Sequence, residues 1–272
     1  MLHIFVAPEK APRMIRRFTR ERALRPVRNR LRFSLLRRRL EPGTRFLDRP
    51  PAEAIAVLAP HPDDDVIGCG GSLCKHRRAG EDVTVIYLTD GGRGNDWTAG
   101  PSPELARTRR REAEEAADLL GIRKLVFLDF PDGELAPGRV TTNRIYQALE
   151  VSGARCVFLP SPLDDHPDHQ AANRILASLI PRLDRNTSVY AYEVWTPLEP
   201  NRLVDITEAV AVKEAAIRRH ASQTRLVDYA AATLGLNRFR ALSVTAGHGF
   251  CEAFFAAEAE TYRRLVKEIL GI

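Results

Sequence analysis

The feature that most constrains the fold is a series of short, unbroken apolar runs separated by longer amphipathic stretches. Four runs rich in Val, Ile and Leu occur at residues 54–60, 82–88, 124–130 and 155–160. A strand with one face in water alternates apolar and polar residues, whereas a strand buried on both faces is continuously apolar. These runs therefore predict strands of a parallel sheet that is covered by helices on both faces.

The stretches between the runs are helix-like, and strand–helix alternation at this spacing predicts right-handed βαβ units. Ser102 is the expected N-cap of the second helix, and Gly121 is its expected end. The fold class is therefore α/β, a Rossmann-like three-layer sandwich with a mostly parallel sheet. The expected helices span about 67–79, 103–121, 141–151, 169–180 and 207–220, with a strand near 188–195, a short apolar run at 250–257 and a last helix to about 270.

Charge is distributed unevenly along the chain. Residues 1–50 contain 15 Lys and Arg against 4 Asp and Glu, whereas the remaining 222 residues contain 26 against 31. We therefore expect a basic N-terminal arm over residues 1–50 and one domain over residues 51–272. No stretch approaches the roughly 18–20 apolar residues of a membrane span, which excludes an integral membrane protein.

The sequence also indicates a cytoplasmic protein. The first residues lack the pattern of a secretory signal, and the four cysteines have no disulfide-framework spacing, so we expect them to be reduced.

The arm alternates arginines with apolar residues between about 11 and 49, which predicts one apolar and one cationic helical face, with a break at Pro26. Such a helix can lie on an anionic membrane, so peripheral contact at the inner face and a lipid-linked substrate form one hypothesis. Alternatively, the apolar residues pack on the body. Nucleic-acid binding is not expected, because the arm has almost no aromatic residues that could stack on bases. The apolar positions are Met14, Phe18, Leu24, Val27, Leu31, Leu35, Leu36 and Leu40.

Two motifs rich in His and Asp follow two of the predicted strands. HPDDD occupies residues 61–65 after the first strand, and DDHPDH occupies residues 164–169 after the strand at 155–160. Either motif alone could serve only as a turn or a helix cap. Ligands of open parallel sheets bind outside the carboxyl ends of the strands, so both motifs are expected to face one crevice.

The residue types in these motifs indicate metal-assisted hydrolysis. His61, His169 and Asp64 supply two imidazoles and a carboxylate, a set typical of catalytic zinc sites that keep one position open. Asp63 can act as a general base on water, and His166 can face a developing oxyanion or a leaving group. Together they favour a hydrolase that acts on an acyl group.

The chain resembles the LmbE/PIG-L family of zinc-dependent N-acetylglucosaminyl deacetylases. The resemblance runs from about Ile55 to Phe255 and rests on HPDDD with the following GCGG, on VTVIYLTDG, on HPDH, and on the KEAAIRRHASQ and GFCEAF segments. One departure is Asp65, which stands where the family usually has Glu. The shorter side chain leaves the expected ligands and base unchanged. The difference therefore concerns a contact behind the ligands or a helix cap, not the chemistry.

The resemblance implies roles for seven residues. Zinc, or ferrous iron in the cell, would be bound by His61, Asp64 and His169, with Asp63 as general base. His166 would assist the oxyanion or protonate the leaving amine, and Arg109 and Asp132 would contact the sugar. Four further residues could line or approach the site, or could have ordinary structural roles: Glu193, Trp195, His248 and Glu252.

The expected function is therefore removal of the N-acetyl group from an N-acetylglucosamine-type conjugate by a metal-dependent hydrolase. A zinc hydrolase of a non-sugar amide or ester is one alternative, because the metal-binding residues do not define the rest of the substrate. A catalytically weak sugar-binding protein tethered by its basic arm is another. Nothing in the sequence selects the conjugated group.

Overall fold

The computed structural model describes residues 20–40, 43–52, 54–94 and 100–272. Its centre is one eight-stranded sheet in the order β1-β7-β8-β6-β5-β2-β3-β4. β8 runs antiparallel to both of its neighbours, and the other paired strands are parallel. The strands are β1 (Arg45–Leu47), β2 (Ala54–Ala59), β3 (Asp82–Thr89), β4 (Lys124–Phe130), β5 (Cys156–Pro160), β6 (Ser188–Tyr192), β7 (Arg202–Asp205) and β8 (Cys251–Glu258).

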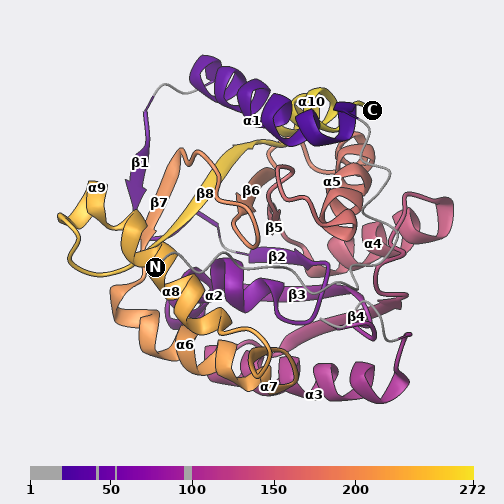
Figure 1. The fold of residues 1–272 in the computed structure, drawn as a ribbon, viewed down its shortest axis with the longest axis vertical. Coiled ribbons are helices and arrows are strands. Elements are labelled where there is room, and N and C mark those ends of the chain that lie inside the picture. Colours follow the sequence, from indigo (N-terminus) through magenta and orange to yellow (C-terminus); the bar gives the residue numbers. More distant parts are fainter. Residues whose placement is uncertain (1–19, 41–42, 53, 95–99) are drawn as a thin grey trace, which may run out of the picture.

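Helices cover both faces of the sheet, so the predicted three-layer α/β fold is confirmed (Figure 1). One layer contains α1 (Arg20–Leu40), α4 (Arg139–Ser152), α5 (Pro167–Leu179) and α10 (Ala259–Leu270). The opposite layer contains α2 (Asp64–Arg78), α3 (Pro103–Leu120), α6 (Val210–Arg219) and α8 (Tyr229–Arg240). Shorter helical segments are α7 (Ala221–Thr224), α9 (Leu242–Thr245), η2 (Ile180–Arg182) and η3 (Thr207–Ala209).

Local sequence explains where the elements begin and end. The four apolar runs form β2 to β5, and β2 and β5 are buried along almost their whole length, as continuous apolar runs predict. The Ser102 side chain accepts a hydrogen bond from the Leu105 N–H and caps α3, and Gly121 ends that helix at φ 74°. The four cysteines are free, as expected, and all four are buried.

The order of strands creates a switch point between β2 and β5. From β2 the chain proceeds to β3 and β4 on one side, whereas β5 and β6 lie on the other side. The helices that follow β2 and β5 therefore diverge to opposite faces of the sheet, which opens a crevice at the carboxyl ends of these two strands. Both His- and Asp-rich motifs begin at this edge.

The described part of the basic segment packs onto the body. α1 contacts α10, where Phe33 is fully buried with its ring centroid 4.9 Å from that of Phe255. β1 pairs in parallel with β7 as an edge strand. The predicted break at Pro26 is wrong, because α1 continues through it; packing of the helix on α10 offsets the one backbone hydrogen bond that proline removes.

The outward side of α1 carries a row of exposed apolar side chains. Val27, Leu31 and Leu35 are four residues apart, so they lie on one face. Met14 and Phe18 are outside the described residues, as are the side chains of Leu24 and Leu40. Among the described residues, no helix is both long and apolar enough to cross a membrane.

Candidate active site

Three ligand atoms from the two motifs meet at the switch point. Asp64 Oδ2 lies 3.2 Å from His61 Nδ1 and 3.2 Å from His169 Nε2, and these two nitrogens are 3.3 Å apart. Tetrahedral ligands at about 2.0–2.1 Å from a zinc ion are separated by about 3.3–3.4 Å. The three side chains are therefore arranged as one face of a metal-coordination tetrahedron, and all three are buried.

The outer nitrogen of each histidine faces a further carboxylate. His61 Nε2 hydrogen-bonds Asp168 Oδ2 at 3.1 Å, and His169 Nδ1 lies 3.3 Å from Asp164 Oδ2. A carboxylate at the outer nitrogen holds a proton there and leaves the inner nitrogen with a lone pair for a metal ion. The residues present thus fit a divalent cation in both donor type and orientation.

The electrostatics of the cluster also favour a cation. Burial lowers the pKa of His169, but the adjacent carboxylates of Asp64 and Asp164 outweigh burial and raise the pKa to about 9. Burial likewise opposes ionisation of Asp64, yet the imidazoles of His169 and His61 hold the pKa of this carboxyl well below its usual range. A negative field that retains protons on buried imidazoles also attracts a metal ion.

Asp63 lies beside the three ligand atoms and contacts a guanidinium. Arg109, on α3, is buried with its Nη2 at 3.1 Å from Asp63 Oδ1. Burial raises the pKa of Asp63, and the charge of Arg109 opposes that rise. Asp132 completes the group, since its Oδ1 lies 3.3 Å from His61 Nε2 and its Oδ2 accepts the Arg93 N–H.

His166 is the N-cap residue of α5. Its Nδ1 accepts the Asp168 N–H at 3.2 Å, and its ring centroid lies 4.6 Å from that of His61. Burial and the neighbouring imidazoles of His61 and His169 lower the pKa of His166 to about 4. A neutral imidazole whose Nδ1 accepts a hydrogen bond carries its proton on Nε2.

The crevice enclosed by these groups has a volume of about 80 Å³, which is room for a few atoms. It is lined by His61, Asp63, Asp64, Ile67, Gly94, Arg109, Asp132, His166, Val194, Trp195 and Tyr229.

Comparisons with known proteins agree with this geometry. A family model described as PIG-L, GlcNAc-PI de-N-acetylase, matches residues 56–180, which include both motifs. The diacetylchitobiose deacetylase of Thermococcus kodakarensis is 33% identical over 186 residues, which cover 62% of this chain and 69% of the relative. The chain belongs to the PIG-L family.

Two other matches, a deacetylase and a hydratase, show that proteins similar to this chain are named for different reactions. The solved structure of N,N'-diacetylchitobiose deacetylase from Pyrococcus horikoshii, in complex with its inhibitor MPG, superposes with a TM-score of 0.70 at 26% identity. It covers 90% of this chain and 95% of its own. A 4-oxalmesaconate hydratase of Pseudomonas putida is 29% identical over 200 residues, covering 66% of this chain and 77% of the relative.

In this PIG-L protein all seven residues singled out from the sequence line or adjoin one crevice. Asp65 points away from it: the side chain is fully buried and accepts a hydrogen bond from the Tyr87 hydroxyl at 3.1 Å.

Trp195 lines the crevice. Glu252 lies elsewhere, because it accepts the backbone N–H groups of Gly71 and Ser72, and His248 is exposed.

Sequence reasoning missed three residues of the site. Asp164 and Asp168 flank the histidines inside DDHPDH, so a search for a carboxylate behind each candidate ligand could have found them. Tyr229 begins α8, a helix that the apolar pattern did not reveal.

Proposed function

We propose that the protein is a metal-dependent N-deacetylase that removes the acetyl group from an N-acetylglucosamine-type conjugate. The proposal rests on the facing ligand atoms of His61, Asp64 and His169, which lie 3.2–3.3 Å from one another, with the buried Asp63 carboxylate beside them. Family membership and the similarity to a diacetylchitobiose deacetylase support the reaction and the substrate class.

His61, Asp64 and His169 would hold the metal, which we propose to be zinc, with ferrous iron as the cellular alternative. Such an ion acidifies bound water and polarises a carbonyl group. Asp168 hydrogen-bonds the outer nitrogen of His61, and Asp164 lies 3.3 Å from the outer nitrogen of His169; both carboxylates favour a proton on the outer nitrogen, which would leave the inner nitrogens available as ligands.

Asp63 is the proposed general base. Its partner Arg109 favours the ionised carboxylate in a buried position where the carboxylate would otherwise hold its proton. A positioned base of this kind contributes about 10²–10⁴-fold to a rate.

His166 is proposed to donate a hydrogen bond from Nε2 to the developing oxyanion, and the leaving amine would take the proton that Asp63 has removed from water. The hydrogen bond at Nδ1 supports this tautomer. Arg109 and Asp132 remain the proposed substrate contacts, although both already pair within the crevice.

One observation favours a neutral substrate over the carboxylated substrate of a hydratase. Among the described residues that line the crevice, Arg109 is the one permanent cation. Its guanidinium lies 3.1 Å from Asp63 and 3.9 Å from Asp132, so its charge is already balanced. Apart from the proposed metal, a substrate with several carboxylates would find no unpaired side-chain cation in the described lining, whereas a neutral amide would need none.

The direct test is a mass-spectrometric screen of the metal-loaded protein against N-acetylglucosaminyl conjugates, with 4-oxalmesaconate, an N-acetyl amino acid and an aryl acetate in parallel. We expect acetate release from the amino-sugar conjugates. Hydration of the carboxylated substrate, or cleavage restricted to the non-sugar amide or ester, would refute the sugar assignment.

We also propose that α1 adsorbs to anionic membranes, with residues 51–272 as the catalytic domain and 1–50 as the basic segment. The helix contains nine arginines and a single acidic residue, and Val27, Leu31 and Leu35 are more than half exposed on one face. Arginines beside an exposed apolar row match an anionic interface, which offers both phosphate charge and hydrocarbon.

A further inference from the structure

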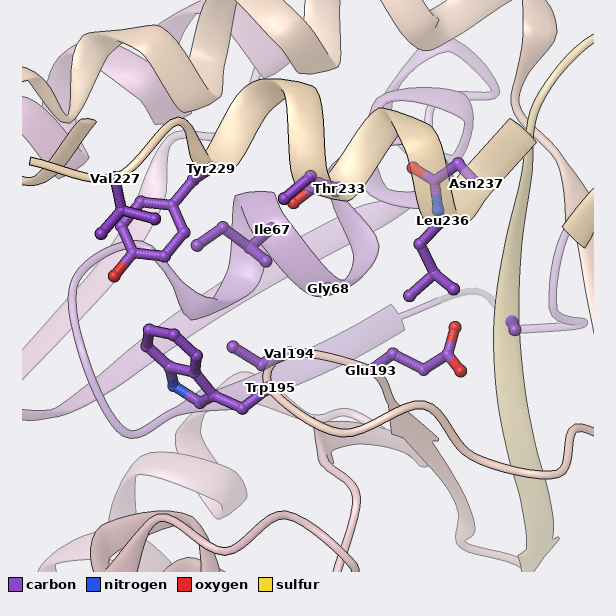
Figure 2. Close-up of a pocket in the computed structure, with 12 residues that line it drawn as sticks. Ile67, Gly68, Glu193, Val194, Trp195, Val227, Tyr229, Thr233, Leu236 and Asn237 are labelled. Carbon is purple, nitrogen blue, oxygen red and sulfur yellow. The ribbon is translucent and has the colours of Figure 1, made fainter. Parts of the chain in front are cut away.

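A second cavity opens beside the crevice. It has a volume of about 210 Å³ and lies between α8, α2 and the segment that follows β6 (Figure 2). Ile67, Val194, Trp195 and Tyr229 line both spaces, so the cavity adjoins the crevice along these four side chains.

The two ends of the cavity differ in character. Trp195 and Tyr229 stand at the end shared with the crevice, their ring centroids 5.5 Å apart at 77°. Aliphatic side chains such as Ile67, Val194 and Leu236 form most of the middle, with the Thr233 hydroxyl among them (Figure 2). A group that extends from the crevice past Trp195 and Tyr229 therefore contacts two aromatic rings first and mainly aliphatic side chains after them.

The far end is polar. The carboxylate of Glu193 and the amide of Asn237 lie there (Figure 2). Glu193 is already paired with Arg240 and accepts the Leu198 N–H. Asn237 is only 4% exposed, yet within the described residues its Oδ1 has no hydrogen-bond partner. A buried amide oxygen left without a partner costs about 1–3 kcal/mol, so a ligand that reaches it gains by pairing with it.

We propose that this cavity binds the group conjugated to the amino sugar, and that this group is a single apolar ring with a hydroxyl at its far end. The inference rests on the proposed deacetylase function and adds the class of substrate. A cavity of about 150 Å³ holds benzene, so a space of this volume accepts one ring with a substituent. A hydroxyl can donate or accept a hydrogen bond, so it can pair with either the oxygen or the NH2 group of the Asn237 side chain.

A second sugar fits the walls less well. A pyranose carries hydroxyls around its whole rim, and the aliphatic middle of the cavity would leave several of them without partners. A longer N-acyl chain would end in a methyl group against Glu193 and Asn237, which are polar. The apolar ring with a polar tip is the class that satisfies both ends.

The test compares aglycones on the metal-loaded enzyme. The substrates are methyl, phenyl and 4-hydroxyphenyl N-acetylglucosaminides of both anomers, together with diacetylchitobiose and the N-butyryl analogue of the methyl glycoside. Burial of a phenyl ring predicts a kcat/KM about 10–100-fold above that of the methyl glycoside. The hydroxyl is expected to add a further gain of roughly 5-fold.

Two variants locate the effect. Leu236→Trp fills the cavity and should abolish the preference for aryl over methyl, whereas Leu119→Trp, on the outer side of α3, should retain it. Asn237→Leu should remove only the difference between phenyl and 4-hydroxyphenyl substrates. Equal kcat/KM for all aglycones, a preference for diacetylchitobiose, or a gain that follows the N-acyl length would overturn the proposal.

A binding measurement separates failure of this inference from failure of the proposed function. 4-Hydroxyphenyl β-D-glucoside has no amide to cleave, so its calorimetric affinity is independent of turnover. Binding about 10-fold tighter than methyl β-D-glucoside, lost in Leu236→Trp and kept in Leu119→Trp, would support the cavity even if no deacetylation occurred. Equal affinities of the two glucosides would reject the cavity even in an active deacetylase.

Discussion

Arg109 Nη2 lies 3.1 Å from Asp63 Oδ1, and both side chains are buried at the wall of the crevice. This pair connects α3 to the residue that precedes α2, two elements far apart in the sequence. Burial alone favours a protonated Asp63, and the guanidinium charge opposes it. Arg109 therefore lowers the pKa of the proposed base, in addition to its predicted contact with the substrate.

Replacing Arg109 with Met should shift the pH dependence of catalysis. Without the positive charge the pKa of Asp63 rises, so the acidic limb of kcat/KM moves to higher pH and activity at pH 7 falls at least about 10-fold. Arg109→Lys keeps the charge and should keep the limb in place. If the acidic limb of kcat/KM does not move in Arg109→Met, the charge of Arg109 does not control the ionisation of Asp63.

Metal content should depend on Asp64 but not on its neighbour Asp65. Asp64→Ala removes one of the three facing ligand atoms, so bound metal should fall from about one equivalent to a small fraction. Asp65→Asn changes a carboxylate that bonds Tyr87 outside the crevice and should retain the metal. Elemental analysis of the purified variants measures both, and equal metal content would argue against the ligand set.

Much of this architecture was predictable because its determinants are local. The unbroken apolar runs specify β2 to β5, and the motifs that follow β2 and β5 place His61 and His169 at one edge. β1, β7 and α8 were missed, since strands of three or four residues and a helix with a weakly apolar face leave little periodicity.

Pairings across the molecule were not readable from the sequence. Arg109 opposite Asp63, and Asp168 behind His61, depend on how α3 and α5 dock on the sheet. The continuation of α1 through Pro26 has the same origin, because contact with α10 decides it and local propensity does not.

His220 should make stability depend on pH. Burial, and then the charge of Arg109, lower the pKa of His220 to about 3, so it stays neutral in the folded protein. The unfolded chain binds this proton near pH 6.5, so its proton uptake exceeds that of the folded state between about pH 6.5 and 3. Stability should therefore fall with decreasing pH in that window, by up to about 1.4 kcal/mol per pH unit.

Denaturant titrations of His220→Gln across this window provide the check. The variant should lose this part of the pH slope, even if its stability at pH 7 is lower. His248→Gln, which changes an exposed histidine, is the control and should leave the slope as in the wild type. A His220→Gln slope equal to that of the wild type would contradict the assignment.

Membrane adsorption should depend on the outward row of α1. Leu31→Asp with Leu35→Asp places two negative charges among the arginines and removes apolar surface, so sedimentation with anionic vesicles should fall about 10-fold or more. Val140→Asp, at an equally exposed apolar position on α4, should have no effect. If the wild type does not sediment with anionic vesicles, α1 serves only to cover the sheet.

We propose that a metal held by His61, Asp64 and His169 works with Asp63 as the base of an amide hydrolysis. The most direct measurement is acetate release from an N-acetylglucosaminyl conjugate by Asp63→Asn, together with its metal content. We expect about one equivalent of metal and a rate about 10²–10⁴-fold below that of the wild type. Full metal occupancy with near-wild-type deacetylation would show that Asp63 is not the base.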